Sequence, residues 1–572
     1  MLFAAAMSFV LILYGCGGGS SAPDAGEVRI THLPNVTALS ATKNKIASTS
    51  ASPLPDGVDA MQIEFFDSNG RSILGPIEVD AEPVVEIRNV PLSAASTTVS
   101  YLRNGGLELA EDNEAIVWDG GLGTASPVPA ASPAAFTRWK TSVDANGVAS
   151  VSLSSSEVGG GAAKDFLIKG VAYSPAPIGA NNKEGPAFGD YFWDTPGGFL
   201  DWDRVWKRDL ENIRKKGFNA VRVYSLIANP IFDTGAIPSP ADIAADPELR
   251  VREHKKFLDA AWNNGVNPIY VLAGIPTPDK LWKESQFRNG SNAAVIEFWD
   301  NNFTASLNQL KDHPAIIGFT MFNEQGGVDD FQGSGAKHYW SQVQKYSQRA
   351  KQIAPDKLIG WAFFDNPDFA RNTVAYRREY AKSIDFYGMN AFQPVRVSGA
   401  VDPWQKSIQG DTARPVFMTE FGIPATGRRN DSKDPSAFYA DQTTVKKAAD
   451  SMAKMLPLLF QHPAVAGVFY FEWSDEWWKQ DSVSGFPRLI TRQEGSSTFV
   501  DYFPNLWYDE EGFGLHSIAL DKRAADKPYS DKAYIDAGNT TVDILTERTS
   551  LMDAVTTAYK NAEQVRKNAL GF

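Results

Sequence analysis

The stretch Ala315–Gln325, AIIGFTMFNEQ, decides the fold. Its apolar run is short, is rich in Ile, Phe and Met, and follows a segment with helical texture. Such a run is typical of a parallel strand that is buried on both faces. The run ends in Asn323 and Glu324, and a carboxylate in that position costs free energy unless it is paired or takes part in chemistry. We therefore expect a functional site at the carboxyl end of this strand.

A second stretch, Pro415–Gly422 (PVFMTEFG), repeats the pattern later in the chain and places Glu420 near its end. Two buried strands that each deliver a glutamate at the carboxyl end supply the groups needed for acid/base or nucleophilic work on a glycosidic bond. The pair therefore predicts a carbohydrate-active site.

The composition limits the possible partners. The chain has 572 residues, 43% of them hydrophobic and 22% charged, which are globular values and suggest two or more domains. A net charge of −13 disfavours nucleic acid or an anionic membrane surface as the main partner and suits a neutral substrate. Most of the 15 Trp, 18 Tyr and 34 Phe residues are expected to fill cores, although Trp around a cleft also suits the flat apolar faces of sugars.

Cysteine and histidine usage argues against a metal or redox site. Cys16 is the single cysteine, so the chain can form neither an internal disulfide nor a cysteine metal cluster. The six histidines are scattered and show no HExxH spacing, which disfavours a tight catalytic zinc site. We expect no cofactor.

The N-terminus predicts export. Residues 1–15 are apolar but too short for an ordinary membrane anchor, so they suit the hydrophobic region of an export signal. Leu13-Tyr14-Gly15-Cys16 resembles a bacterial lipobox, in which the Cys is lipidated, although Tyr14 replaces a small residue and no Lys or Arg precedes the run. We expect an exported protein that contacts a membrane only through a lipid on Cys16, in the outer membrane or periplasm. The alternative is a cleaved signal, an incidental Cys and a secreted protein.

The composition and the sequence pattern change several times along the chain. Residues 1–26 form the signal and a first linker, and 27–123 alternate short strand-like runs with Asn-Gly-type turns, which predicts a small immunoglobulin-like β-sandwich for spacing or sugar binding. Residues 124–163 begin with a Pro/Ala/Ser run and are predicted to be a linker. Residues 164–540 are predicted to form the catalytic domain with a loop-rich extension beside the cleft, and 541–572 a helical tail.

The catalytic domain repeats a strand–loop–helix pattern. Eight strands are predicted at Phe166–Ala172, Ala220–Tyr224, Asn267–Leu272, Ala315–Phe322, Leu358–Phe363, Ile384–Met389, Val416–Thr419 and Val465–Phe471. Helical stretches lie between them, so we predict an α/β fold of the (β/α)8 TIM-barrel type. A doubly wound sheet is disfavoured because no GxGxxG follows the first strand.

Functional residues of a barrel gather at the carboxyl ends of its strands. In this chain those ends carry Tyr173, Arg222, Tyr224, Asn323, Glu324, Asn390, Glu420, Glu472 and Trp473.

In this arrangement the chain resembles the retaining glycoside hydrolases of clan A. Asn323-Glu324 and Thr419-Glu420-Phe421-Gly422 match the clan's strand-four and strand-seven motifs. Ile168–Tyr173 (IKGVAY), Lys207-Arg208-Asp209 and Phe218–Tyr224 (FNAVRVY) look like the first two strands of family 72 β-1,3-glucanosyltransferases. That family usually has a Tyr two residues after the strand-six Asn, where this chain has Phe392.

The resemblance implies roles for the strand-end residues. Glu324 would be the general acid and then the base, and Glu420 the nucleophile, held by Arg222. Asn323 would bind the sugar 2-hydroxyl, Trp473 would stack under the ring, and Tyr173, Tyr224 and Asn390 would line the subsite. Glu472, Asp475 and Glu476 would bind sugar hydroxyls, hold a cation or form a salt-bridged loop.

The favoured function is an exported retaining β-glycosidase or glucanosyltransferase that acts on a polysaccharide or oligosaccharide, preferably β-glucan. The alternatives are an exo-acting β-galactosidase or β-mannanase, and a non-catalytic polysaccharide-binding envelope lipoprotein. The sequence leaves open the linkage, the balance of hydrolysis and transfer, and the oligomeric state.

Overall fold

The computed structural model describes part of the chain. The described residues are 9–14, 25–32, 60–66, 72–80, 84–91, 96–103, 107–115, 136–155, 161–175, 181–182, 185–186, 202–229, 252–324, 333–364, 371–392, 397–406, 413–428, 438–476, 497–499, 503–519 and 544–571. The chain divides into two compact units, Met1–Ala134 and Ala135–Phe572. Cys16, the predicted lipidation site, lies outside the described residues.

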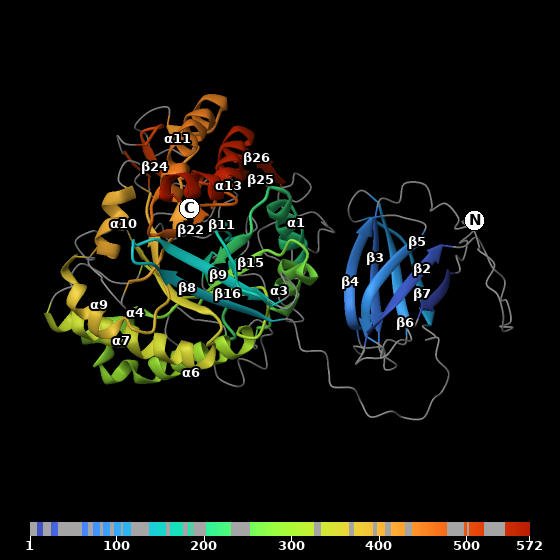
Figure 1. Ribbon diagram of the computed structural model, residues 1–572, viewed down its shortest axis with the longest axis horizontal. Coiled ribbons are helices and arrows are strands. Elements are labelled where there is room, and N and C mark those ends of the chain that lie inside the picture. Colours follow the sequence, from blue (N-terminus) through green and yellow to red (C-terminus); the bar gives the residue numbers. More distant parts are fainter. Residues whose placement is uncertain are drawn as a thin grey trace. The chain divides into compact units, whose positions relative to one another are not determined.

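The described strands of the first unit form two antiparallel sheets (Figure 1). One has the order β1-β2-β5 and the other β4-β3-β6-β7. The strands are β1 (Phe9–Tyr14), β2 (Ala25–His32), β3 (Ala60–Phe66), β4 (Ser72–Asp80), β5 (Val84–Pro91), β6 (Ser96–Arg103) and β7 (Leu107–Ala115). Ile63 and Phe65 alternate along β3 and are fully buried, as expected where one face of a sheet covers a core. The predicted antiparallel strands are thus present, whereas the immunoglobulin-like classification stays a prediction.

Strand β1 lies inside the predicted export signal. It pairs with β2 along its length, from Phe9 opposite His32 to Tyr14 opposite Glu27. Because strand pairing does not report on transport, export stays a prediction.

The second unit contains a closed barrel of eight parallel strands (Figure 1). They are β11 (Ile168–Ala172), β14 (Ala220–Val223), β15 (Tyr270–Gly274), β16 (Ile316–Asn323), β17 (Leu358–Phe364), β18 (Tyr387–Asn390), β19 (Val416–Phe421) and β22 (Val465–Tyr470). Pairing of β11 with β22 closes the barrel. Every residue of β16 from Ile316 to Phe322 is buried, as the unbroken apolar run predicts. The predicted TIM-barrel fold is confirmed.

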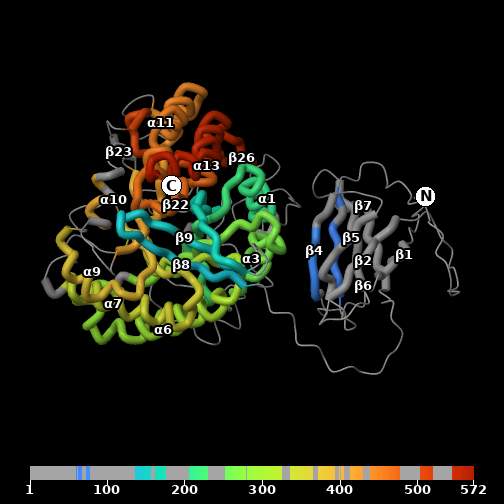
Figure 2. The backbone as a smooth tube through the Cα atoms, in the orientation of Figure 1, coloured from blue at the N-terminus to red at the C-terminus, as the bar shows by residue number. Residues whose placement is uncertain are grey.

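Helices follow the strands and surround the barrel, as the tube trace shows (Figure 2). They are α1 (Trp202–Lys215), α3 (Lys255–Trp262), α4 (Asp279–Trp282), α5 (Glu284–Phe287), α6 (Ala293–Leu310), α7 (Gly333–Ile353), α9 (Val374–Tyr380), α10 (Val397–Lys406), α11 (Gln442–Gln461) and α13 (Thr549–Leu570). Local sequence explains the start of α11, where the Asp441 side chain accepts hydrogen bonds from the backbone of Thr443 and Thr444. None of the described helices is long and apolar enough to cross a membrane.

Short elements extend the loops. The two-stranded sheets pair β12 (Asn181–Asn182) with β13 (Gly185–Pro186), β20 (Gly427–Arg428) with β21 (Phe438–Tyr439), β23 (Ser497–Phe499) with β24 (Trp507–Asp509), and β25 (His516–Ala519) with β26 (Ile544–Glu547). The 3-10 turns are Asn263–Gly265, Gly290–Asn292 and Glu510–Gly512.

The C-terminal helix α13 belongs to the barrel. The helix predicted in the tail at 541–572 is present, and one face of α13 buries Leu551, Val555 and Tyr559. The Tyr559 hydroxyl donates to the carbonyls of Gly170 in β11 (2.8 Å) and Val468 in β22 (3.2 Å). Helix α13 thus covers the outside of the seam where the barrel closes.

A hairpin covers the end of the barrel at which the strands begin. It comprises β8 (Thr137–Val143) and β9 (Ala149–Ser155), and β10 (Lys164–Asp165) pairs with β9. The hairpin bonds to residues that lie just before barrel strands: Trp139 N donates to Asp356 O (2.9 Å), and Ala149 N to Pro463 O (2.8 Å). The predicted linker 124–163 therefore ends earlier than expected, because Ala135 onward belongs to the barrel unit.

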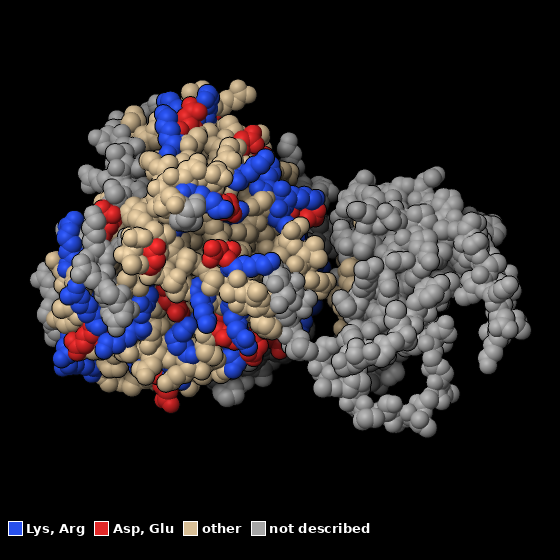
Figure 3. Space-filling model, in the orientation of Figure 1, with Lys and Arg blue, Asp and Glu red and all other residues tan. Residues whose placement is uncertain are grey.

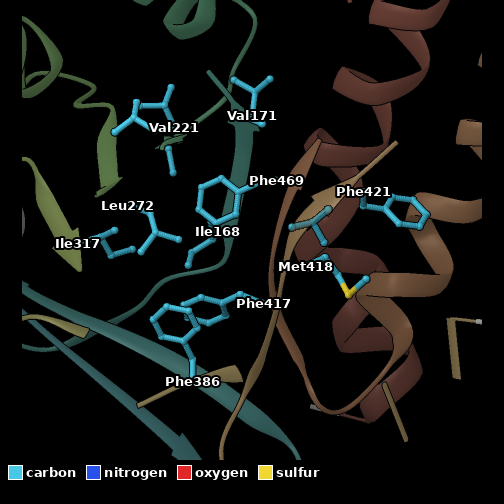
Figure 4. Packing of buried hydrophobic residues seen from close by; sticks show 14 of the residues in the cluster. Ile168, Val171, Val221, Leu272, Ile317, Phe386, Phe417, Met418, Phe421 and Phe469 are labelled. Atoms are coloured by element: carbon cyan, nitrogen blue, oxygen red, sulfur yellow. The ribbon is translucent and has the colours of Figure 1, made fainter. Parts of the chain in front are cut away.

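The barrel interior is filled by large side chains. Figure 4 shows Ile168, Leu272 and Phe469 gathered in one region, with the rings of Phe386 and Phe417 below them. The last two rings are stacked with centroids 4.3 Å apart. Such filling means that chemistry is confined to the ends of the strands.

Candidate active site

Four strand ends bring the predicted polar residues together. Arg222 and Tyr224 come from the end of β14, Asn323 and Glu324 from β16, Asn390 from β18, and Glu420 from β19. Arg222 is 1% exposed and Glu420 5%, so this cluster reaches into the mouth of the barrel. Gly422 lets the end of β19 approach β22, because a Cβ there would lie 2.0 Å from the carbonyl oxygen of Phe471.

Glu420 is held by one of its two oxygens. Arg222 Nη1 donates to Oε1 at 2.6 Å, and the Tyr224 hydroxyl donates to the same oxygen at 2.9 Å. The guanidinium of Arg222 also lies over the Tyr224 ring, 4.5 Å from its centroid. Oε2 accepts no hydrogen bond from the part of the chain that the structure describes. One oxygen is thus fixed, and the other is available to a ligand.

The Tyr224 hydroxyl stays protonated at neutral pH. Burial raises the pKa of its hydroxyl well above 10, and the negative charge of Glu420 raises it further. The hydroxyl therefore acts as a permanent donor to Glu420. Tyr224 therefore supplies a hydroxyl next to the Glu420 carboxylate. At the position two residues after Asn390, where a Tyr hydroxyl was in question, this chain has Phe392.

Asn390 links the two predicted catalytic glutamates. Its Nδ2 donates to Asn323 Oδ1 (2.8 Å) and to Glu324 Oε1 (3.0 Å). Arg222 Nη2 donates to Asn323 Oδ1 as well, at 2.7 Å. The same short network therefore contacts Glu324 on one side and Glu420 on the other.

The two glutamates have different surroundings. Glu420 is buried against a guanidinium, whereas Glu324 is exposed beyond the end of β16. Glu324 has a left-handed backbone with φ of 54°, which is unfavourable for a residue with a side chain. Its backbone N–H donates to Ala362 O (2.9 Å), so the strained turn is tied to the neighbouring strand β17. Different environments are expected where two carboxylates divide two tasks.

The end of β22 adds further carboxylates. Glu472 and Glu476 are 1% and 3% exposed, and the charges of both contribute to the raised pKa of Tyr224, after burial and Glu420. The charge of Glu472 thus acts on the Tyr224 hydroxyl, and its predicted role in substrate binding stays a prediction.

Asp475 has a structural partner. It forms a two-point ion pair with Arg548 at the start of α13, with distances of 2.6 and 2.7 Å. Burial alone would lower the pKa of Arg548, but the charge of Asp475 reverses this and raises it. Of the three predicted alternatives for Asp475, the salt bridge is the one that the structure shows. Its partner Arg548 had no motif in the sequence.

Two predicted subsite residues are buried against other parts of the chain. Trp473 is 1% exposed and packs against Phe218 and His516, with ring centroids 6.2 and 4.3 Å away. Tyr173 is fully buried, and its hydroxyl donates to Asp209 of α1 at 3.0 Å. The predicted stacking floor at Trp473 and wall at Tyr173 are therefore corrected, because buried side chains present no face to a sugar.

The described part of the loop-rich extension contacts residues at the ends of β18, β19 and β22. The backbone of Leu515 donates to Glu472 O (2.8 Å), and that of Ala425 donates to Gly512 O (2.8 Å). Phe392 packs against Phe513 and Tyr508, with centroids 5.2 and 5.8 Å away. The described residues of the extension thus pack against the ends of barrel strands, and its predicted position beside a cleft stays a prediction.

No group of three or more His, Cys, Asp or Glu side chains suited to a metal ion occurs among the described residues.

Comparison with known proteins gives fold-level neighbours only. No family model matches the chain. No curated protein matches it. Among solved structures, a β-glucuronidase of Ruminococcus gnavus matches with 12% identity and a TM-score of 0.36, over 89% of this chain and 64% of that one. A β-D-glucuronidase of Dictyoglomus thermophilum matches with 12% identity and a TM-score of 0.36, over 83% of this chain and 63% of that one.

The chain thus spans just under two thirds of the first of these neighbours. Both neighbours are glycosidases by name. At such identities and TM-scores they carry no argument for this chain, whose fold is established by its own strand pairing.

Proposed function

We propose that the chain is a retaining β-glycosidase, with Glu420 as the nucleophile and Glu324 as the acid and then the base. The observation that carries this proposal is that the described residues donate hydrogen bonds to one of the two carboxylate oxygens of Glu420. Arg222 and Tyr224 fix Oε1, and Oε2 accepts no hydrogen bond from the described residues. A nucleophilic carboxylate needs this arrangement, since one oxygen must attack while the other keeps the group oriented.

In the first step, Glu420 Oε2 attacks the anomeric carbon and Glu324 gives a proton to the departing oxygen. The bond to the leaving group breaks as the glycosyl–enzyme bond forms. In the second step, Glu324 takes a proton from water or from a sugar hydroxyl, which then displaces Glu420. Retention requires the two carboxyl groups to lie about 5–5.5 Å apart.

Tyr224 and Arg222 would act mainly in the second step. When the glycosyl ester breaks, negative charge returns to Glu420, and both donors are already in place on Oε1. Donors that are oriented before charge develops stabilise a transition state without reorganisation.

We further propose a neutral β-linked polysaccharide, preferably a β-glucan, as the substrate. Glu472 and Glu476 place negative charge near Tyr224, and the Arg222 guanidinium is already bonded to Glu420 and Asn323. These charges disfavour a uronic acid. On the described face in Figure 3, acidic and basic side chains are interspersed, which also suits a neutral partner.

Export with a lipid on Cys16, and transfer to a sugar acceptor, are parts of the proposal that rest on sequence. A β-galactosidase or β-mannanase shares the same two carboxylates and remains the alternative substrate reading. A non-catalytic polysaccharide-binding lipoprotein is disfavoured by the hold on Glu420.

Trapping with 2-deoxy-2-fluoro glycosides tests the reaction. The expected result is a covalent adduct on Glu420 that is absent in Glu420→Gly, together with cleavage within a panel of β-glucans, mannans, galactans and glucuronides. Absence of an adduct with every fluoroglycoside, together with full activity of Glu420→Gly, would refute the proposal. Cleavage of glucuronides alone would overturn the substrate class and leave the mechanism.

A further inference from the structure

The amide of Asn390 is contacted at both of its ends. At the oxygen end, the Thr419 hydroxyl donates to Oδ1 at 2.8 Å, and Arg222 Nη1 donates to it at 3.3 Å. At the nitrogen end, Nδ2 donates to Asn323 Oδ1 and Glu324 Oε1. The amide therefore stands between two donors and two acceptors.

This arrangement fixes the orientation of the amide. A guanidinium can only donate, so the end of the Asn390 side chain that faces Arg222 must be the oxygen. With a flipped amide, the NH2 group would face Nη1 and Oδ1 would face the Glu324 carboxylate, which are two repulsive contacts. The shorter of the two bonds that hold Oδ1 comes from Thr419, a fully buried residue of β19.

We propose that Thr419 is a positioning residue for the acid/base glutamate and acts through Asn390. By holding Oδ1, its hydroxyl aims Nδ2 at Glu324, an exposed residue with a left-handed backbone. The residue before the nucleophile thus orients the other carboxylate. This inference rests on the proposed function of Glu324.

The leaving group of the substrate separates this role from others. Departure of dinitrophenolate needs no proton, whereas departure of an alkyl alcohol requires the general acid. Thr419→Val keeps the shape of the side chain and removes the donor. We expect kcat/KM to fall about ten-fold for alkyl or unactivated aryl glycosides, the effect of one lost hydrogen bond, and to stay near wild type for dinitrophenyl glycosides.

Two variants serve as controls. Thr419→Ser keeps the donor and should restore the loss. Thr320→Val makes the same change at a buried threonine of β16 and should leave both activities unchanged. Among the described residues, the Thr320 hydroxyl reaches only the Ala273 carbonyl, at 3.5 Å.

Three outcomes are decisive. Selective loss with the poor leaving group, restored by Thr419→Ser, supports the inference. Equal loss with both leaving groups overturns it, because Thr419 would then act on its neighbour Glu420. Wild-type kinetics in Thr419→Val also overturns it. A wild-type protein that cleaves no glycoside would instead mark failure of the proposed function.

Discussion

Replacing Tyr224 by Phe isolates one hydrogen bond to the proposed nucleophile. The substitution removes the donor that lies 2.9 Å from Glu420 Oε1 and keeps the ring that packs under the Arg222 guanidinium. Hydrogen bonds to charged groups contribute about 1.5–3 kcal/mol. At 1.36 kcal/mol per tenfold change in rate, the step that depends on this bond should slow about 10- to 150-fold.

That step should be the breakdown of the glycosyl–enzyme. The carboxylate leaves in this step, and without Tyr224 its returning charge is less stabilised. In the first step the charge on Glu420 is dispersed, so the loss of a donor costs little. With a dinitrophenyl β-glycoside we therefore expect kcat to fall, kcat/KM to change little, and a burst of dinitrophenolate to appear in stopped-flow measurements.

Tyr270→Phe is the matched control. Tyr270 lies on the neighbouring strand β15, is 2% exposed, and its hydroxyl has no hydrogen-bond partner among the described residues. This variant should keep wild-type kinetics. A Tyr224→Phe enzyme with unchanged kcat, or with kcat and kcat/KM lowered in parallel, would refute the proposed role in deglycosylation.

Three other perturbations test the surroundings of individual buried or partly buried side chains. Trp473→Phe should leave oligosaccharide affinity unchanged in titration calorimetry, because the indole is buried. A large loss of affinity would instead indicate that the Trp473 ring contacts the sugar. Asp475→Asn breaks the buried pair with Arg548 and should cost about 3–5 kcal/mol of stability in chemical unfolding, whereas an unchanged midpoint would contradict the pairing. Burial lowers the pKa of Lys357 from 10.5 to about 7, so between these values the unfolded chain holds a proton that the folded chain lacks, and stability should rise with pH. The full difference corresponds to roughly 5 kcal/mol, and thermal melts from pH 7 to 10 should show a rise that Lys357→Met lacks; equal slopes would contradict this.

The barrel could be predicted from sequence because its strands are buried on both faces. A run such as Ile316–Phe322 has no polar side to place in water, so its apolar pattern is unbroken and its end is marked by the first polar residues. The same rule located Arg222, Asn390 and Glu420, since parallel strands deliver their carboxyl ends to one rim.

Side-chain direction at the strand ends could not be predicted. Trp473 follows Glu472 directly, and neighbouring residues of an extended chain point to opposite sides. The sequence alone does not say which of the two faces the cleft, and the structure places Trp473 against Phe218. Arg548 was missed for another reason: its partner Asp475 is 73 positions away, and no local pattern records such a pairing.

The seam where the barrel closes lies between the C-terminal helix α13 and the Arg222–Glu420 ion pair. Arg222 in β14 and Glu420 in β19 are separated around the barrel by β11 and β22, the two strands whose pairing closes it. Their ion pair therefore spans this seam on the inside, while Tyr559 of α13 bonds to carbonyls of both seam strands on the outside. Since a shift between β11 and β22 would change the distance between Arg222 and Glu420, the packing of α13 helps to hold the proposed nucleophile in place. A helix that composition alone marks as a tail is thereby part of the barrel unit that carries the candidate site.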